Sequence, residues 1–201
     1  MDSAYLAAST ALLWVALYYL PVGGPIFRLT LPLPLALLLL RHGSRIALEG
    51  LVVCVLLLVA LMGPIRGPLM LFPYGILGIW LGWGWRRRLS WWVTWSVGTV
   101  IGSLGFLVRL AVLSVLLGEN IWVVLTTSAS GLVEKLLALM QITVSLDLVQ
   151  VQLAALLLVL LQNLITVFAL HALAHWIFAR IQEPIPEPPE GLLAVFGLDG
   201  P

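Results

Sequence analysis

The chain has 201 residues, of which 62% are apolar and 9% are charged, and its formal net charge is +1. Soluble domains are about 45–50% apolar and about 25% charged, so a water-soluble fold could not cover this much apolar surface. The mean hydropathy of +1.12 therefore predicts an integral membrane protein that contacts the lipid bilayer. The near-neutral charge argues against nucleic acid as a partner, because that function needs a concentrated basic surface.

Apolar runs punctuated by proline and glycine predict about six transmembrane helices, because a bilayer core needs about 20 mainly apolar residues in a helix. Pro32 and Pro34 fall in the first turns of the second run, where a missing N–H group is tolerated. The predicted spans cover about residues 4–20, 29–41, 45–63, 68–85, 91–117 and 152–180. They predict an all-α, polytopic bundle over residues 1–182, followed by a proline-rich tail over residues 183–201.

The stretch between the fifth and the last span is ambiguous. Its polar residues recur at helical spacing and make one polar stripe on an otherwise apolar helix over about residues 121–142. Such a helix can lie in the interface, dip into the protein or cross as a seventh span. We expect an amphipathic outer helix. The stripe comprises Asn120, Thr127, Ser130, Glu134 and Gln141.

The positions of the arginines favour six spans over seven. With six spans, the arginines that follow the second, fourth and sixth spans all lie on the same side of the membrane. The positive-inside rule identifies that side as the cytoplasmic one. A seventh span would move Arg180 and the acidic tail to the other side. We therefore predict that both termini are cytoplasmic. The arginines concerned are Arg41, Arg45, Arg86, Arg87, Arg88 and Arg180.

Arg109 is the most costly residue in the predicted bundle. It lies about eight residues, or roughly 12 Å, from the outer end of its helix, and an arginine inside the bilayer costs about 2.5–3.5 kcal/mol on insertion scales. Asn163 has a similar depth in the last span, while Glu134 and Arg28 approach from the outer side. We predict that these four residues bind a ligand in an outward-facing polar cavity. The alternative is an ion pair between Arg109 and Glu134 that only holds helices together.

Small residues at three- and four-residue spacing predict close helix packing in lipid. Glycines have this spacing in the predicted spans 68–85 and 91–117, and we expect them to pack helices together. Alanines have it in the first span, where they either pack internally or form a docking face for another protein. The glycines are Gly75, Gly78, Gly82, Gly98, Gly102 and Gly105, and the alanines are Ala4, Ala7, Ala8 and Ala11.

Motifs for chemistry are missing from the sequence. There is no Walker loop, GxSxG or HExxH sequence, and no paired carboxylates lie on adjacent turns of a span. His171 and His175 share a helix face, but no acidic or thiol ligand accompanies them. We therefore expect no enzyme activity, no cofactor and no metal site. The tryptophans that flank Arg86–Arg88 are typical of an interfacial belt.

Six short segments occur in a specific order along the chain. They are RLTLPLPLA (28–36), LRHG (40–43), MGPIRG (62–67), FPYGILG (72–78), GEN (118–120) and EPIPEPP (183–189). Together they resemble the cyanobacterial and chloroplast branch of the YybS-like membrane proteins, a family without an assigned activity. The resemblance implies a location in the plasma or thylakoid membrane.

The layout is in turn similar to the S components of energy-coupling factor vitamin transporters. These are six-helix proteins that bind a vitamin from the outer side and dock a transmembrane coupling subunit through small residues on the first helix. The similarity implies that Ala4, Ala7, Ala8 and Ala11 match the docking face. Our leading hypothesis is a binding subunit for an unknown small ligand, with a coupling subunit and ATPases as partners. The rivals are a scaffold or assembly factor for membrane complexes and, more weakly, a membrane enzyme acting on lipid or isoprenoid.

Overall fold

The computed structural model describes residues 2–20, 24–139, 147–183 and 185–189, and within these ranges the fold is all-α, as predicted. The elements are α1 (Asp2–Tyr19), α2 (Gly24–Thr30), α3 (Leu33–His42), α4 (Ser44–Arg66), the 3-10 turn η1 (Pro68–Leu71), α5 (Tyr74–Arg86), α6 (Trp91–Leu117), α7 (Ile121–Leu139) and α8 (Leu148–Arg180).

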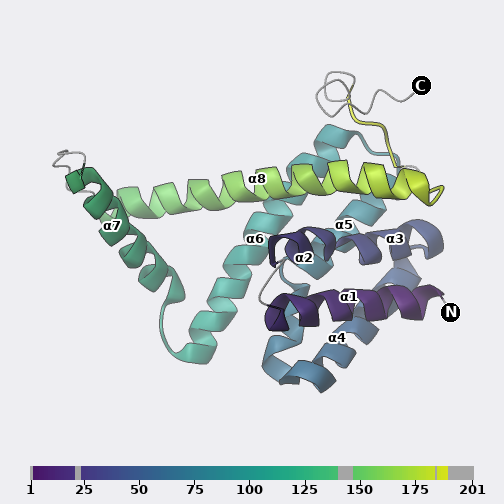
Figure 1. Cartoon of the computed structure of the whole chain (residues 1–201), viewed down its shortest axis with the longest axis horizontal. Coiled ribbons are helices and arrows are strands. Elements are labelled where there is room, and N and C mark those ends of the chain that lie inside the picture. The colour runs from purple at the N-terminus through teal and green to yellow at the C-terminus, as the bar shows by residue number, and fades with distance from the viewer. Residues whose placement is uncertain (1, 21–23, 140–146, 184, 190–201) are drawn as a thin grey trace.

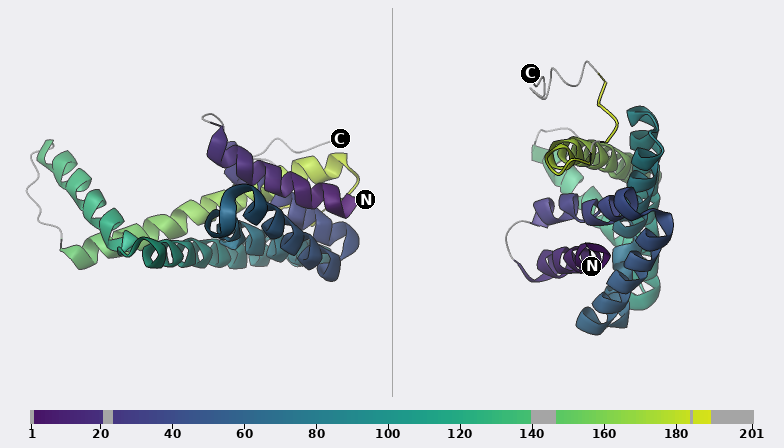
Figure 2. Two further views of the ribbon diagram at one scale, coloured as in Figure 1. Left: turned by 90° about the horizontal axis from the view of Figure 1, so that it is seen from below. Right: turned by 90° about the vertical axis from the view of Figure 1, so that its right-hand side faces the viewer.

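The helices form a packed block and an open side (Figures 1 and 2). The block contains α1, α3, α4 and α5, with contacts between α3 and α5, α1 and α4, and α3 and α4. Helices α6 and α8 pack against each other beside this block and then diverge, and α7 connects their far ends. The start of α1 and the end of α8 lie at the same end of the molecule.

Prolines explain where the helices differ from the predicted spans. The predicted span 29–41 is interrupted at Pro32, which separates α2 from α3. The predicted span 68–85 begins instead with η1, and α5 starts only after Pro73. Proline has no N–H group and restricts the residue before it, so each proline begins a new helix rather than continuing one. The predicted span 91–117 has the same limits as α6.

Helix length supports fewer crossings than the six predicted. Helices α4, α6 and α8 are long and apolar enough to cross a membrane, whereas the apolar parts of α1 and α7 are shorter. Helices α3 and α5 have 10 and 13 residues, which corresponds to roughly 15 and 20 Å against a hydrocarbon core of about 30 Å. The structure therefore shows three candidate membrane spans within the described part of the chain.

Glycine backbones make the closest helix contacts. A Cβ atom on Gly78 would lie 2.7 Å from the Pro32 carbonyl oxygen, and one on Gly82 would lie 2.6 Å from that of Ala36. Helix α5 therefore packs directly on the α3 backbone. The other predicted glycines also lie in tight contacts: Gly75 with Leu51, Gly98 with Val167, Gly102 with Asn163 and Gly105 with Pro73.

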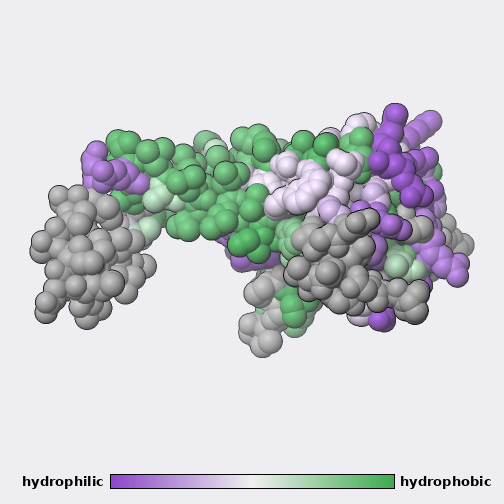
Figure 3. Space-filling view, turned by 90° about the horizontal axis from the view of Figure 1, so that it is seen from above, coloured by the Kyte–Doolittle hydropathy of each residue, from purple (hydrophilic) through white to green (hydrophobic). Residues whose placement is uncertain are grey.

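Six arginines gather at one end of the molecule, which we call the basic end. The Arg86 Nη1 atom donates to the Leu39 carbonyl oxygen at 3.0 Å and thus joins the ends of α5 and α3. Arg41 pairs with Glu183, just after α8, at 3.1 Å. Figure 3 shows the largest group of hydrophilic residues at this end of the molecule, a long hydrophobic stretch beside it and a smaller hydrophilic group at the far end. The six arginines are Arg41, Arg45, Arg86, Arg87, Arg88 and Arg180.

Candidate functional site

A cavity of about 340 Å³ lies where α6 and α8 meet the first residues of α3 and α5. We call it the arginine cavity, because both Arg28 and Arg109 line it. Three of the four predicted ligand-binding residues, Arg28, Arg109 and Asn163, thus come together from α2, α6 and α8. The other lining residues are Pro32, Pro73, Tyr74, Leu77, Phe106, Leu110, Leu113, Leu125, Val159, Gln162, Thr166 and Leu170.

Aromatic side chains of α1 hold Arg109 in place. Its Nη2 atom donates to the Tyr18 hydroxyl at 2.9 Å, and its Cζ atom lies 5.4 Å from the centroid of the Trp14 ring. The Trp14 ring packs edge-on against both Tyr18 and Tyr74. The guanidinium therefore lies beside a π face and one hydroxyl, which leaves further N–H donors for the cavity.

Neither arginine of the cavity has an ion pair with a described carboxylate. The only salt bridges among the described residues join Arg41 to Glu183 and Arg45 to Glu49. The predicted partner, Glu134, belongs to α7, but its side chain lies outside the described residues. The structure therefore leaves open the predicted Arg109–Glu134 ion pair, and the described wall of the cavity contains two cations and no anion.

Two helix N-termini face the same cavity. Pro32 and Pro73, which line it, are the N-cap residues of α3 and α5, and no side chain caps either helix. The first N–H groups of a helix have no partner within it, and the helix dipole places partial positive charge there. These helix ends add to the positive potential that the arginines create.

Asn163 is positioned by close contact between α8 and α6. Its side-chain amide donates to the Val159 carbonyl oxygen at 2.8 Å, and a Cβ atom on Gly102 would lie 2.6 Å from its Oδ1 atom. The missing side chain at Gly102 thus makes room for the amide at the cavity wall. Gln162 and Thr166 bring two further polar groups from α8 to the same wall.

The predicted docking alanines lie mainly inside the protein. Ala7 and Ala11 are each only 1% exposed and belong to the core formed by α1, α3 and α4. They pack against other helices of the same chain. This arrangement agrees with internal packing, one of the two alternatives that the sequence left open for these alanines. Ala4 is exposed and Ala8 is partly buried, so two of the four remain accessible.

His171 is a buried packing residue. Its Nδ1 atom lies 2.8 Å from the Val167 carbonyl oxygen, which can only accept, and its Nε2 atom lies 2.9 Å from the Thr94 hydroxyl. Trp85 and Trp91 pack edge-on against its ring. The predicted tryptophan belt therefore lies partly in the core. Among the described residues no group of three His, Cys, Asp or Glu side chains could hold a metal ion.

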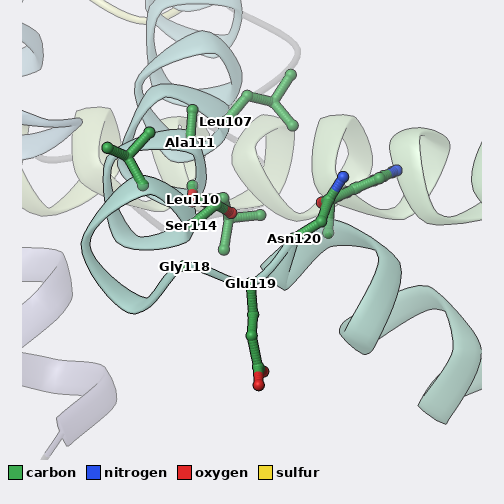
Figure 4. Close-up of a pocket in the computed structure, with 9 residues that line it drawn as sticks. Leu107, Leu110, Ala111, Ser114, Gly118, Glu119 and Asn120 are labelled. Carbon is green, nitrogen blue, oxygen red and sulfur yellow. Dashed lines mark hydrogen bonds between the residues drawn. The ribbon is translucent and has the colours of Figure 1, made fainter.

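A second hollow, the α6–α7 groove, adjoins the arginine cavity. It is an open depression of about 600 Å³ between the last turns of α6 and the start of α7, and Figure 4 shows its residues. The Glu119 side chain points away from the others in this view. The groove is lined by Leu107, Leu110, Ala111, Ser114, Val115, Gly118, Glu119, Asn120 and Trp122.

Sequence reasoning missed the aromatic residues that surround Arg109. Tyr18 and Trp14 lie on α1, about 90 positions away along the chain, and nothing in the hydropathy pattern connects them to α6. Sequence reasoning placed Pro32 in the first turns of the span 29–41 and Pro73 inside the span 68–85, and neither was predicted to line a site. Their placement at one cavity depends on the packing of α3 against α5.

Comparison with known families gives one match. Residues 7–190 match the family described as "Predicted membrane protein (DUF2232)". No curated protein and no solved structure matches the chain.

Proposed function

This chain belongs to the DUF2232 family of predicted membrane proteins, and we propose that it is a membrane-embedded subunit that binds a small anionic solute for transport. The observation that carries the proposal is the meeting of Arg28 and Arg109 in one cavity whose described wall has no carboxylate. Two cations that share one cavity repel each other, and Arg109 is partly shielded from water. A bound anion would relieve both costs.

The size and shape of the cavity are suitable for this role. Its volume of about 340 Å³ lies at the lower end of the range of about 300–1,000 Å³ that is usual for small-molecule pockets. Its wall combines apolar side chains with a few convergent polar groups. The uncapped N-termini of α3 and α5 add donors of the kind that membrane transporters use for anionic groups.

The proposal includes a six-pass topology similar to that of S components. It assigns one pass each to α1, α2 with α3, α4, η1 with α5, α6 and α8. In Figure 1, α1, α3 and α8 run along the length of the molecule, whereas α4, α5 and α6 run obliquely to them. The helices α3 and α5 are too short to cross the membrane alone, so α2 would extend the pass of α3 and η1 would extend the pass of α5. The positive-inside rule would then place the basic end and both termini in the cytoplasm. A plasma or thylakoid membrane and a YybS-like branch of the family remain part of this proposal.

Partner subunits would supply the energy for transport. The sequence contains no Walker loop, so ATP hydrolysis would fall to ATPases that act through a transmembrane coupling subunit. Because Ala7 and Ala11 are buried, a docking face built on all four alanines of α1 is not part of the proposal. An enzyme activity is not proposed.

A scaffold for other membrane complexes is the second candidate. The hydrogen bond from Arg109 to Tyr18 and its contact with Trp14 favour it, because an arginine held in this way could serve only to join α1 to α6. In that case the cavity would be incidental.

Affinity purification of the tagged chain in mild detergent separates the two candidates. The transport proposal predicts recovery of a coupling subunit with ATPases. Recovery of a different membrane complex without ATPases, together with loss of that complex in an Arg109→Gln variant, would contradict transport and support the scaffold. Arg66→Gln is the matched control, since Arg66 is exposed and also ends a helix away from the basic end.

A further inference from the structure

The arginine cavity and the α6–α7 groove adjoin each other at Leu110 of α6. Leu110 lines both hollows. On either side of it, Phe106 of the cavity is followed by Leu107 of the groove, and Leu113 of the cavity by Ser114 of the groove. The two hollows are therefore neighbouring parts of one surface, with the cations at one end and apolar residues at the other.

The Ser114 hydroxyl and the Asn120 side-chain oxygen in the groove already have hydrogen-bond partners. The Ser114 hydroxyl donates to the Leu110 carbonyl oxygen at 2.8 Å and accepts from the Ile121 N–H at 3.0 Å. The Asn120 side-chain oxygen accepts from the Val123 N–H at 3.2 Å. The groove therefore offers an occupant mainly hydrocarbon contacts, whereas the cavity offers unpaired positive charge.

Charge fixes the direction in which an occupant would lie. The carboxylate of the groove belongs to Glu119, which points away from the other lining residues (Figure 4). A negative head group beside Glu119 would be repelled, and beside Arg28 and Arg109 it would be attracted. The head of a charged ligand therefore belongs in the cavity and its tail in the groove.

The rim of the groove is open and apolar. Val115, which lines the groove, is 83% exposed, and Leu117, next to the lining residue Gly118, is 65% exposed. In a bilayer such side chains contact lipid. A hydrocarbon chain could thus enter the groove sideways without passing through water.

We propose that the ligand is an amphipathic anion, with a phosphate or carboxylate head between Arg28 and Arg109 and a hydrocarbon chain in the α6–α7 groove. This inference rests on the proposed function, which requires only that the cavity bind an anion. It adds the class of ligand and its orientation.

The test compares long and short probes with the same head group. The full chain in phosphatidylcholine nanodiscs is titrated with dodecyl phosphate and methyl phosphate, and separately with dodecanoate and acetate. An Arg28→Gln, Arg109→Gln double variant measures partition into the lipid, and Arg66→Gln is the charge control. For at least one head group, we expect the long probe to bind at least about tenfold more tightly than the short one. We expect the double variant to lose at least about tenfold for the probes that bind.

A variant of the groove tests the position of the chain independently of the arginines. Ala111 is an exposed lining residue, so Ala111→Trp fills the groove at little risk to folding. It should reduce the ratio of long-probe to short-probe affinity at least about fivefold. Val112→Trp, at an exposed neighbour that does not line the groove, should leave that ratio unchanged.

The outcomes separate this inference from the proposed function. If long and short probes bind with equal affinity and neither binds the double variant, the ligand is not amphipathic. The proposed function as an anion-binding subunit then still holds. An unchanged ratio in Ala111→Trp overturns the placement in the groove. If no probe binds the wild-type chain more tightly than it binds the double variant, both this inference and the proposed function are wrong.

Discussion

The packed block and the open side are both built of apolar helices but pack differently. In the block, Gly78 and Gly82 bring the α5 backbone against the α3 backbone. On the open side, the first half of α8 has no glycine, and side chains such as Leu157 are exposed. In lipid, apolar character does not by itself drive helices together, whereas small residues that permit close approach do. Backbone contact at glycines therefore distinguishes the α3–α5 contact from the exposed stretch of α8 around Leu157.

The arginine cavity lies between the packed block and the open side. The block holds Pro32, Pro73, Trp14 and Tyr18 in place around one side of the cavity. The other side is formed by the diverging helices α6 and α8, which leave space between them. The two arginines lie where these parts meet, because Arg109 belongs to α6 but is held by α1, and Arg28 belongs to α2.

The largest expected effect on the free energy of unfolding comes from shortening a leucine in α8, and its size should differ between the two halves of the helix. Leu170 is fully buried and Leu157 is 66% exposed. Leu170→Ala should lower the free energy of unfolding by about 3 kcal/mol, because it leaves a cavity in the core. Leu157→Ala should change it by less than about 0.5 kcal/mol. Unfolding by SDS in mixed micelles measures both, and equal losses would show that the first half of α8 is packed in the membrane.

A smaller change in the free energy of unfolding should follow when one glycine of the block and one glycine of the open side are each replaced by alanine. Gly82→Ala places Cβ against the Ala36 backbone and should cost about 2 kcal/mol of unfolding free energy. Gly131→Ala in α7 meets no atom within 4 Å and should stabilise the helix by about 0.5 kcal/mol. The same SDS titration checks the pair. A tolerated Gly82→Ala would mean that α5 and α3 do not pack through their backbones.

Within the block, Arg86 should contribute more than its neighbour. Arg86→Gln removes a charged donor from the Leu39 carbonyl oxygen and should cost about 1 kcal/mol. Arg87 makes only a cation–π contact with Trp83, at 5.7 Å, so Arg87→Gln should cost less than half as much. Thermal unfolding of the two variants in one detergent compares them. The reverse order would contradict the joining of α3 to α5 through Arg86.

The smallest effect is expected at the tail. The side chains of the Arg41–Glu183 pair are 31% and 36% exposed, so solvent and salt screen the pair. Arg41→Gln should reduce stability by no more than about 0.5 kcal/mol at low salt and by less at 0.5 M NaCl. A larger, salt-independent loss would show that the tail is part of the block rather than attached to it.

Three of the residues predicted from the sequence line one cavity in the structure, whereas the six predicted spans do not match the observed helices one to one. Helix limits such as 91–117 follow from hydropathy and from Ser90 and Gly118, which cap α6. The meeting of Arg28, Arg109 and Asn163 could be predicted because all three are costly in lipid and lie toward the same side.

Other features depend on neighbours that no linear pattern reveals. The alternating alanines of α1 show that helices approach closely there, but not whether the partner is α4 or another protein; Ala7 and Ala11 turned out to be internal. Likewise, Trp85 and Trp91 look like headgroup anchors by type, yet both pack around His171. Single-sequence reasoning identifies small and aromatic residues and leaves their contacts undetermined.

The most direct test of the anion-binding cavity is native mass spectrometry of the chain released from its own membranes. Wild type, Arg109→Gln and Arg66→Gln are purified side by side in the same mild detergent. The account predicts a retained anionic small molecule on wild type and Arg66→Gln that is at least about tenfold less abundant on folded Arg109→Gln. Equal retention in all three proteins, or a bound species without an anionic group, would contradict it.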